Sequence, residues 1–483
     1  MPRFYLWLNG AACEGGGKPC TIRNPFDCKE VAEASVAEKK QIKRALSSST
    51  KAFYHIRTTP RFARAEWLER IAKELDENYT EIVDTLIMEG GKPRMFAEQE
   101  VDRSIDVFHW AAEECRRFTG EQLPIDGMSR GKGYDGHTLR EPIGPIFGIC
   151  PFNFPLNLVA HKIAPALAAG NSIIIKPASN TPISALILAR LASEAGVPPG
   201  GVNVLPMRHA DTAMLFDSPA IKLISFTGSA EVGWQIKAAA RKQRVILELG
   251  GNSGSIVAES ADIEWAATRL ALGGFAQAGQ SCIAVQRIYA HQHIYDEFLK
   301  ALKRATRQLR AGDPRDADTI VGPMIDEQAV ERAESIIAKA KEQGARVVCG
   351  GKRLPLGCGN ILEPTILSDV HEEMRAQKEE VFAPIITVSK VEHVTEAIRL
   401  INSSRFGLQA ALFSNDLSQI QLSISDLQAG GVVINDFPTL RVDMMPYGGI
   451  KDSGLGREGI RSAMLEMSNE KTVLIRNPTH AAK

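Results

Sequence analysis

Residues 143–176 read IGPIFGICPFNFPLNLVAHKIAPALAAGNSIIIK and combine two short apolar runs with a longer helical pattern between them. The run 145–150 is typical of a buried strand, 156–167 of a helix, and 172–176 of a second buried strand. A strand, a crossover helix and a second strand form the basic unit of a parallel sheet. The stretch therefore predicts an α/β fold.

The same alternation continues on both sides of this unit. A helical pattern at 181–195 precedes strand-like runs at 201–205 and 222–226, which is the rhythm of a Rossmann-like, dinucleotide-binding domain. The segment 35–120 is helix-rich, with long patterns of 3.6-residue period such as 63–79 and 98–118. Beyond Gly251 a second α/β series begins, so we expect two α/β domains in one chain.

The composition limits the kind of partner. The chain has 483 residues, which is too long for one simple core and predicts two or three domains. Lys plus Arg and Asp plus Glu both number 57, and this balance argues against a nucleic acid or a membrane surface as the main partner. No run reaches the roughly 18 to 20 apolar residues of a membrane span, and the amino terminus has too short an apolar run for a signal peptide.

The eight cysteines are scattered and form no CxxC pair and no cysteine–histidine cluster. We therefore expect no structural metal and no disulfide framework. A reducing cytoplasm is the expected location. The cysteines stand at positions 13, 20, 28, 115, 150, 282, 349 and 358.

Cys282 is the strongest candidate nucleophile. It ends the glycine-bounded turn 275–282, after the apolar helical run 263–275 and before a strand pattern at 285–290. This setting predicts a presented thiol, although a lone cysteine is more often a small buried residue. Glu248 ends the apolar strand of VILELGG, where burial should raise its pKa and suit it to act as a general base. A nucleophile with such a base indicates covalent catalysis.

Seven motifs in order resemble the aldehyde dehydrogenase superfamily, from Asn24 to about Val473. The two signature motifs are ELGG at 248–251 and GQSC at 279–282. The others are PFNFP at 151–155, IKPA at 175–178, SFTGS at 225–229, EEVFAP at 379–384 and PYGGIKDSG at 446–454.

The resemblance implies a mechanism. Cys282 attacks the aldehyde as a thiolate, and the side chain of Asn153 and the backbone N–H of Cys282 stabilise the oxyanion. Taken alone, Asn153 reads as the N-cap of the following helix. Glu248 then activates a water that releases the free acid. A coenzyme A-acylating semialdehyde dehydrogenase is an alternative that Glu248 argues against, and a catalytically silent homologue with a binding or structural role is another.

The resemblance also implies NAD or NADP as the cofactor. The turn from a buried strand into a helix carries Gly228, Ser229 and Gly233, and helix-start N–H groups there can meet a pyrophosphate. An ordinary turn capped by Ser229 is the simpler interpretation. Lys176 and Ser179 correspond to the adenosine ribose site, where the small Ser179 leaves room for a 2′-phosphate. The nicotinamide side would hold Phe152, Glu380 and Phe382.

Further residues map to the aldehyde channel by resemblance, and His161 and Ala276 stand where many members have aromatic residues. Arginine can grip an anionic group through two hydrogen bonds, which favours a small anionic or hydroxylated aldehyde. Lactaldehyde, succinate semialdehyde and phosphonate- or phosphate-bearing aldehydes are the expected types. Surface ion pairs are the alternative role for the arginines. The proposed channel residues are Arg103, His161, Arg441 and Tyr447, with Asn157, Leu158, Leu272 and Ala276.

These assignments divide the chain. Residues 1–122 and 140–250 are expected to form the cofactor-binding domain, and 251–430 the catalytic domain. By resemblance, 123–139 and 465–483 form an oligomerisation arm, which implies a homodimer or homotetramer.

Overall fold

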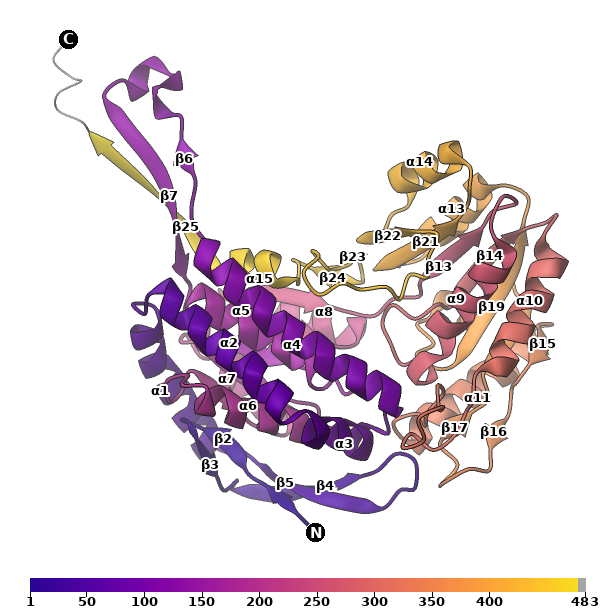
Figure 1. The fold of residues 1–483 in the computed structure, drawn as a ribbon, viewed down its shortest axis with the longest axis horizontal. Helices are drawn as coiled ribbons and strands as arrows, with labels where there is room; N and C mark the ends of the chain where they lie inside the picture. The colour runs from indigo at the N-terminus through magenta and orange to yellow at the C-terminus, as the bar shows by residue number, and fades with distance from the viewer. Residues whose placement is uncertain (477–483) are drawn as a thin grey trace.

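Two mostly parallel sheets carry the fold, and the computed structural model describes residues 1–476 (Figure 1). Their parallel central strands confirm the α/β fold. The first sheet has the order β24 (Gly454–Leu455), β12 (Arg244–Glu248), β11 (Leu223–Thr227), β8 (Ile146–Ile149), β9 (Ile173–Lys176), β10 (Val202–Val204), β2 (Leu6–Leu8) and β3 (Ala11–Cys13).

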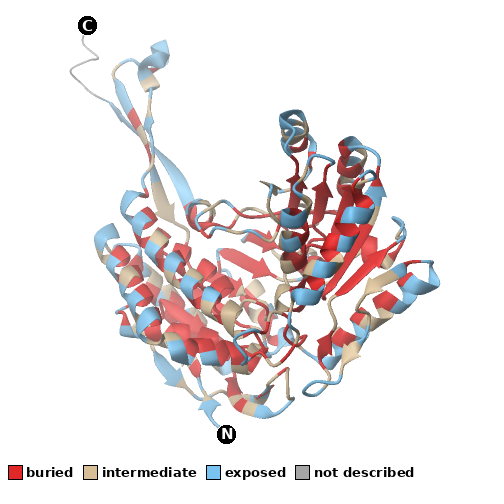
Figure 2. Cartoon of the chain, turned by 45° about the vertical axis from the view of Figure 1, so that its right-hand side comes forward, coloured by how far each residue is buried: buried red, intermediate tan, exposed pale blue. Residues whose placement is uncertain are grey.

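Helices cover the first sheet, and the packed faces form its core. Every residue of α5 is buried, which explains its almost continuous apolar sequence. Figure 2 shows buried sheets inside and exposed outer faces on the covering helices. The helices of this half of the fold, some on the sheet and others packed on those helices, are α1 (Lys39–Ile56), α2 (Arg61–Glu77), α3 (Tyr79–Gly90), α4 (Arg94–Arg117), α5 (Asn157–Ala169), α6 (Ile183–Glu194), α7 (Ala213–Phe216), α8 (Ala230–Ala239) and α15 (Ile460–Glu466).

The second sheet follows the same plan. Its strands are ordered β15 (Arg346–Cys349), β18 (Thr365–Ser368), β19 (Ile385–Val391), β14 (Arg287–His291), β13 (Gly254–Val257), β21 (Gln409–Phe413) and β22 (Gly431–Ile434). Its helices are α9 (Ile263–Phe275), α10 (Tyr295–Gln308), α11 (Glu327–Glu342), α12 (Arg375–Lys378), α13 (Val394–Asn402) and α14 (Leu417–Asp426). We call the two halves the cofactor lobe and the catalytic lobe.

Smaller sheets join and flank the lobes. An amino-terminal ribbon is formed by β1 (Arg3–Phe4), β5 (Glu30–Val36) and β4 (Gly17–Arg23). Two short pairs are β16 (Arg353–Leu354) with β17 (Ile361–Leu362), and β20 (Phe406–Gly407) with β23 (Ile450–Lys451). No helix within residues 1–476 is both long enough and apolar enough to cross a membrane.

A three-stranded ribbon projects from the cofactor lobe (Figure 1). It consists of β25 (Ser468–Arg476), β7 (Tyr134–Pro142) and β6 (Gln122–Leu123). It coincides with most of the expected arm, although residues 465 and 466 still belong to α15. Residues 477–483 of that expectation lie outside the described part of the chain. The predicted domain boundaries and the role of the ribbon in assembly stay predictions.

The register of the first sheet gathers candidate residues at one edge. Phe226 pairs with Ile149, Ile149 pairs with Lys176, and Thr227 pairs with Glu248. Because these strands are parallel, the loops that follow them emerge side by side. Such carboxyl edges are where open α/β sheets bind ligands.

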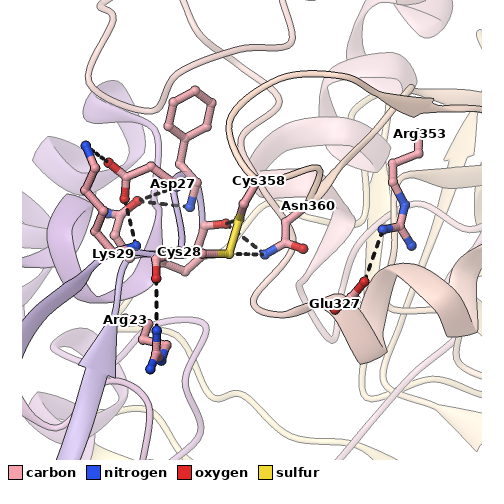
Figure 3. The surroundings of a disulfide bond; sticks show 11 residues. Arg23, Asp27, Cys28, Lys29, Glu327, Arg353, Cys358 and Asn360 are labelled. Atoms are coloured by element: carbon pink, nitrogen blue, oxygen red, sulfur yellow. Dashed lines mark hydrogen bonds and ion pairs between the residues drawn. A yellow bond between two sulfur atoms is a disulfide. The ribbon is translucent and has the colours of Figure 1, made fainter.

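The sequence predicted no disulfide framework, but one disulfide is present. Cys28 and Cys358 are bonded, with their Cα atoms 5.9 Å apart although 330 positions separate them in the sequence (Figure 3). Sequence spacing could not show this, because the pair is created only when the amino-terminal ribbon meets the loop between β16 and β17. The other six cysteines are free.

Candidate active site

Cys282 lies on the tight turn that follows α9. Gln277, Ala278 and Gly279 all have left-handed backbone, with φ of 50°, 56° and 65°, which is unusual for residues other than glycine. A Cβ on Gly279 would lie 2.3 Å from the carbonyl oxygen of Ala383, so only glycine fits there. The turn directs Cys282 into a cavity, where the residue is half-buried.

The cavity has a volume of about 820 Å³ and takes residues from both lobes. Its size is within the range of small-molecule sites. The cofactor lobe contributes Arg103, Phe152, Asn153, Phe154, Thr227, Gly228, Ser229 and Glu248 to its lining. The catalytic lobe and the following loop contribute Cys282, Ile283, Glu380, Phe382, Phe437, Arg441 and Tyr447.

The surroundings of the Cys282 thiol favour its protonated form. Its sulfur lies 3.2 Å from the hydroxyl oxygen of Tyr447. Burial raises the pKa of Cys282 to about 11; the Tyr447 contact lowers it, and the charge of Glu380 raises it. The positive charge of Arg441 also lowers this pKa. Forming the reactive thiolate therefore depends on the charges around the cavity.

Glu248 ends β12 and faces the same cavity. Both carboxylate oxygens are buried without a hydrogen-bond partner. Burial raises its pKa well above the usual value, and the charge of Glu458 raises it further, whereas Arg441 and Lys162 oppose the shift. A carboxylate with a raised pKa is a stronger base than an exposed one, which suits a general base.

Asn153 is tied to the nucleophile loop. Its Nδ2 donates to the carbonyl oxygen of Gln280 at 2.9 Å. An amide nitrogen carries two hydrogens, so one N–H remains for another acceptor. The N-cap alternative for Asn153 is wrong: Oε1 of Glu100, a residue that the sequence analysis did not select, accepts the N–H groups of Leu156 and Asn157 at 3.0 Å each.

A buried ionic network lies behind the cavity. Lys162 donates to Glu458 at 2.8 Å and also to the hydroxyls of Ser225 and Thr227. The second oxygen of Glu458 is 3.6 Å from Nη2 of Arg441. Lys162 could have been selected from the sequence, because it is a lone cation inside an apolar helical run. No feature of the sequence distinguishes Glu458 in this way.

Asp443, also missed, organises two of its neighbours. Arg103 donates to it with Nε at 2.9 Å and Nη2 at 2.7 Å, and His161 Nε2 lies 2.8 Å from it. His161 does not line the cavity but lies fully buried behind Asp443, so the assignment to the channel needs correction. Burial lowers the pKa of His161, and the charge of Arg441 lowers it further, which favours a neutral ring.

Arg441 differs from Arg103 because some of its guanidinium N–H groups form no hydrogen bond. Its guanidinium lies 3.9 Å above the ring of Tyr447, and its side chain is only 7% exposed. Nε and Nη2 are buried without a hydrogen-bond partner. Buried donors of this kind are costly unless a ligand satisfies them.

The channel is less polar than the sequence indicated. Asn157, Leu158, Leu272 and Ala276 line the cavity as expected, but so do several aromatic side chains. Those not selected from the sequence are Phe96, Phe154 and Phe437.

The turn before α8 fits a dinucleotide pyrophosphate. Gly228 and Ser229 line the cavity, and Ser229 makes no side-chain capping bond, so the simple capping interpretation is wrong. The first N–H groups of the ten-residue α8 therefore remain available. Gly228 and Gly233 serve internal packing: an added Cβ would lie 2.5 Å from the Phe226 ring and 2.3 Å from a Leu249 methyl, respectively.

Glu380 approaches the turn that follows Glu248. Its Oε1 accepts the Gly251 N–H at 3.1 Å, and a Cβ on Gly250 would lie 2.1 Å from its other oxygen. Burial raises the pKa of Glu380 to about 7. Phe152 and Phe382 meet edge to face, with ring centroids 5.9 Å apart.

The two adenosine-side candidates lie at the same sheet edge but outside the cavity lining. The amine of Lys176 is 3.5 Å from the Pro177 carbonyl oxygen, and burial lowers its pKa. Ser179 is exposed, and its carbonyl oxygen accepts the Cys20 thiol at 3.4 Å.

One cluster outside the cavity has metal-ligand chemistry. Glu259, His291 and His293, at the carboxyl ends of β13 and β14, bring ligand atoms within 4.8 Å of one another. Nδ1 of His293 lies 2.8 Å from Glu259. None of these residues lines the cavity.

The aldehyde dehydrogenase family model matches residues 13–473, so the chain belongs to this family. A 3-sulfolactaldehyde dehydrogenase of Priestia megaterium is 38% identical over 476 residues, which cover 98% of each chain. The solved structure of aldehyde dehydrogenase 21 from Physcomitrella patens, in complex with the reaction product succinate, superposes with a TM-score of 0.96 at 39% identity over 99% of each chain.

A third comparison bears on the cofactor. Glyceraldehyde-3-phosphate dehydrogenase from Methanocaldococcus jannaschii, solved with NADP, is 36% identical with a TM-score of 0.91, covering 95% of this chain and all of its own. The chain is thus an oxidoreductase that converts an aldehyde to the free carboxylic acid with NAD or NADP. The predicted reaction class and cofactor are confirmed.

Proposed function

We propose that the substrate is a small anionic aldehyde, held by Arg441 and oxidised through a thioester on Cys282. The observation that carries the substrate class is Arg441, which lines the cavity with Nε and Nη2 buried and without a hydrogen bond, only at ion-pair distance from Asp443 and Glu458. Arg103 lines the same cavity, but Asp443 already occupies two of its donors. Arg441 is therefore the main anion contact, and Arg103 is a secondary one.

The charge balance around the cavity supports this choice. Within one group of five residues, Lys162, Arg103 and Arg441 carry three positive charges and Glu458 and Asp443 carry two negative ones, so one positive charge is left over in this group. An incoming carboxylate, sulfonate or phosphonate compensates that charge in a poorly hydrated place. The names of the similar sulfolactaldehyde dehydrogenase and of the succinate complex agree with such a substrate.

Cys282 forms the covalent bond to the substrate, and neighbouring groups assist it. Cys282, as a thiolate, forms a bond to the aldehyde carbon, and the carbonyl oxygen becomes an oxyanion. The spare N–H of Asn153 and the backbone N–H of Cys282 stabilise that oxyanion. Because Gln280 fixes the plane of the Asn153 amide, the donor is already positioned. Tyr447 contacts the sulfur and orients it.

When bound, NAD or NADP would supply the acceptor for the hydride that leaves the carbon attached to Cys282. Phe152 and Phe382 would flank the nicotinamide, Glu380 its ribose, and Gly228 and Ser229 the pyrophosphate. The ends of β9 and β11 would thus hold adjacent parts of the cofactor, the adenosine ribose and the pyrophosphate. Lys176 and Ser179 would face the adenosine ribose, where the small hydroxyl of Ser179 tolerates a 2′-phosphate.

Glu248 completes the reaction by taking a proton from water, whose oxygen attacks the thioester carbon and displaces the Cys282 thiolate. The raised pKa of Glu248 makes its carboxylate a stronger base than that of an exposed glutamate. A coenzyme A-dependent release of the acyl group is the competing outcome.

An aldehyde panel tests the proposal. Succinate semialdehyde, lactaldehyde and a sulfonated aldehyde are compared with butyraldehyde, each with NAD and with NADP, and with and without coenzyme A. We expect the anions to have the higher kcat/KM and the free acid to form without coenzyme A. Equal kcat/KM for succinate semialdehyde and butyraldehyde would refute the anionic substrate. An absolute requirement for coenzyme A would refute hydrolysis by Glu248.

We also propose a homodimer or homotetramer built on the projecting ribbon. Several large apolar side chains on the ribbon are exposed, among them Met128 at 77%, Leu474 at 56% and Ile475 at 52%. Such side chains on an edge strand favour association with another copy. Light scattering coupled to size exclusion tests this, and a monomer at micromolar concentration would contradict it.

A further inference from the structure

We propose that Cys28 and Cys358 form a reversible thiol–disulfide site that fastens the amino-terminal ribbon to the catalytic lobe. Cys28 lies in the turn between β4 and β5, and Cys358 lies in the loop between β16 and β17 (Figure 3). Both residues are exposed, so small thiols and disulfides can reach them. The inference does not depend on the identity of the aldehyde.

The two loops are held in register by hydrogen bonds that do not need the sulfur–sulfur bond. The Cys358 N–H donates to the carbonyl oxygen of Phe26 at 2.7 Å, and Asn360 Nδ2 donates to that of Pro25 at 2.9 Å. Gly357 has φ of 58°, and a Cβ there would lie 2.0 Å from the Phe26 oxygen. Since these contacts keep the two sulfur atoms close together after reduction, the disulfide can form again without rearrangement of the two loops.

The same loop is connected to the nucleophile. The carbonyl oxygen of Asn360 accepts the Met324 N–H at 2.8 Å. The next residue, Ile325, donates its N–H to Oε1 of Gln280 at 2.9 Å. Gln280 in turn accepts the amide of Asn153. The disulfide therefore supports the segment that positions Gln280, two residues before Cys282.

Cys115, Cys150 and Cys282 are poorer targets for the same oxidant than the exposed pair. Cys115 and Cys150 are buried, and burial raises the pKa of Cys150 to about 12. Burial also raises the pKa of Cys282 to about 11. Because thiol–disulfide exchange requires the thiolate, oxidation at the exposed pair can leave the nucleophile reduced.

The reaction balances with a low-molecular-weight disulfide such as oxidised glutathione. One thiolate of the pair attacks it, which gives a mixed disulfide and releases one glutathione. The other thiolate then displaces the second glutathione and closes the Cys28–Cys358 bond. The pair loses two electrons and two protons overall, and glutathione disulfide gains them. A dithiol reverses the exchange.

Closing the bond should slow thermal inactivation, because it ties together segments 330 positions apart. We expect the reduced enzyme to inactivate roughly tenfold faster or more at a temperature near its unfolding midpoint. Activity at low temperature should be similar in both forms, because the hydrogen bonds between the loops persist.

The experiment uses the purified full-length enzyme, treated with oxidised glutathione or with dithiothreitol and then freed of reagent. Thiols are counted after unfolding, and the linked peptides are identified by mass spectrometry under non-reducing conditions. We expect six thiols in the oxidised form and eight in the reduced form, with Cys28 joined to Cys358. Eight thiols after oxidation, or a different linked pair, would overturn the proposal.

Three variants separate this site from general thiol effects. Cys28→Ser and Cys358→Ser should inactivate at the rate of the reduced wild type, with or without dithiothreitol. The control Cys349→Ser alters a free, half-buried cysteine of the same lobe and should keep the wild-type response. A dithiothreitol effect that persists in Cys28→Ser would contradict the proposal. The thiol count needs no substrate, so failure of the proposed aldehyde chemistry leaves this test intact.

Discussion

Replacing Arg441 with alanine should raise KM for anionic aldehydes more than for neutral aldehydes. The guanidinium has two buried donors that form no hydrogen bond, and a hydrogen bond to a charged group contributes about 1.5–3 kcal/mol. Neighbouring Glu458 and Asp443 already compensate part of its charge, at 3.6 and 3.8 Å. We therefore expect a loss of about 2–3 kcal/mol for an anion, which is roughly 30- to 150-fold in KM.

The assay compares kcat and KM for succinate semialdehyde and butyraldehyde in wild type, Arg441→Ala and Arg441→Lys. The loss should appear mainly in KM for the anion, because the contact holds substrate and transition state about equally. Arg441 also lowers the pKa of Glu248, so its removal slows hydrolysis for both aldehydes. Butyraldehyde measures this shared effect, and the difference between the substrates measures the contact.

Arg269→Ala is the matched control. Arg269 also lines the cavity, but it is paired with Asp436 through contacts of 2.6 and 3.0 Å. Its loss should affect the two aldehydes alike. Equal losses for both substrates in Arg441→Ala would refute the assignment of Arg441 as the anion contact.

Three further changes test other parts of the site. Cys282→Ala should abolish oxidation yet retain cofactor binding, measured by fluorescence quenching; substantial residual turnover would exclude Cys282 as the nucleophile. Ser179→Glu should weaken NADP roughly ten- to a hundredfold relative to NAD through like-charge repulsion, and unchanged NADP binding would place Ser179 elsewhere. Because Glu248 must be ionised to act as a base, kcat limited by hydrolysis should rise with pH through its raised pKa. In Glu458→Gln the loss of a negative charge lowers that pKa and should move the rising limb to lower pH; a limb that stays in place would argue against the coupling.

Local sequence patterns were sufficient to predict the helices and strands around the site. The helix expected at 263–275 coincides with α9, and the strand run 172–176 contains β9. The helix expected at 63–79 is divided at Asn78, whose ψ of 18° lies outside helical geometry, so α3 begins at Tyr79. Periodicity alone does not distinguish one bent helical segment from two.

Contacts between segments that are distant in the sequence could not be predicted from the sequence. Arg103 meets Asp443 only in the folded chain, so its charge could not be judged from its neighbours in sequence. Glu100 reaches the start of α5 from another helix, which displaced the expected capping role of Asn153. The Cys28–Cys358 bond depends in the same way on the meeting of two loops.

The most direct test of the covalent mechanism is the intact mass of Glu248→Gln after one turnover with succinate semialdehyde and NADP. Without a base, water should attack slowly, so a burst of NADPH should accompany a mass increase of one acyl group. Peptide mapping should locate that acyl group on Cys282. A burst of NADPH with an unmodified Cys282, or acylation of another residue, would contradict the account.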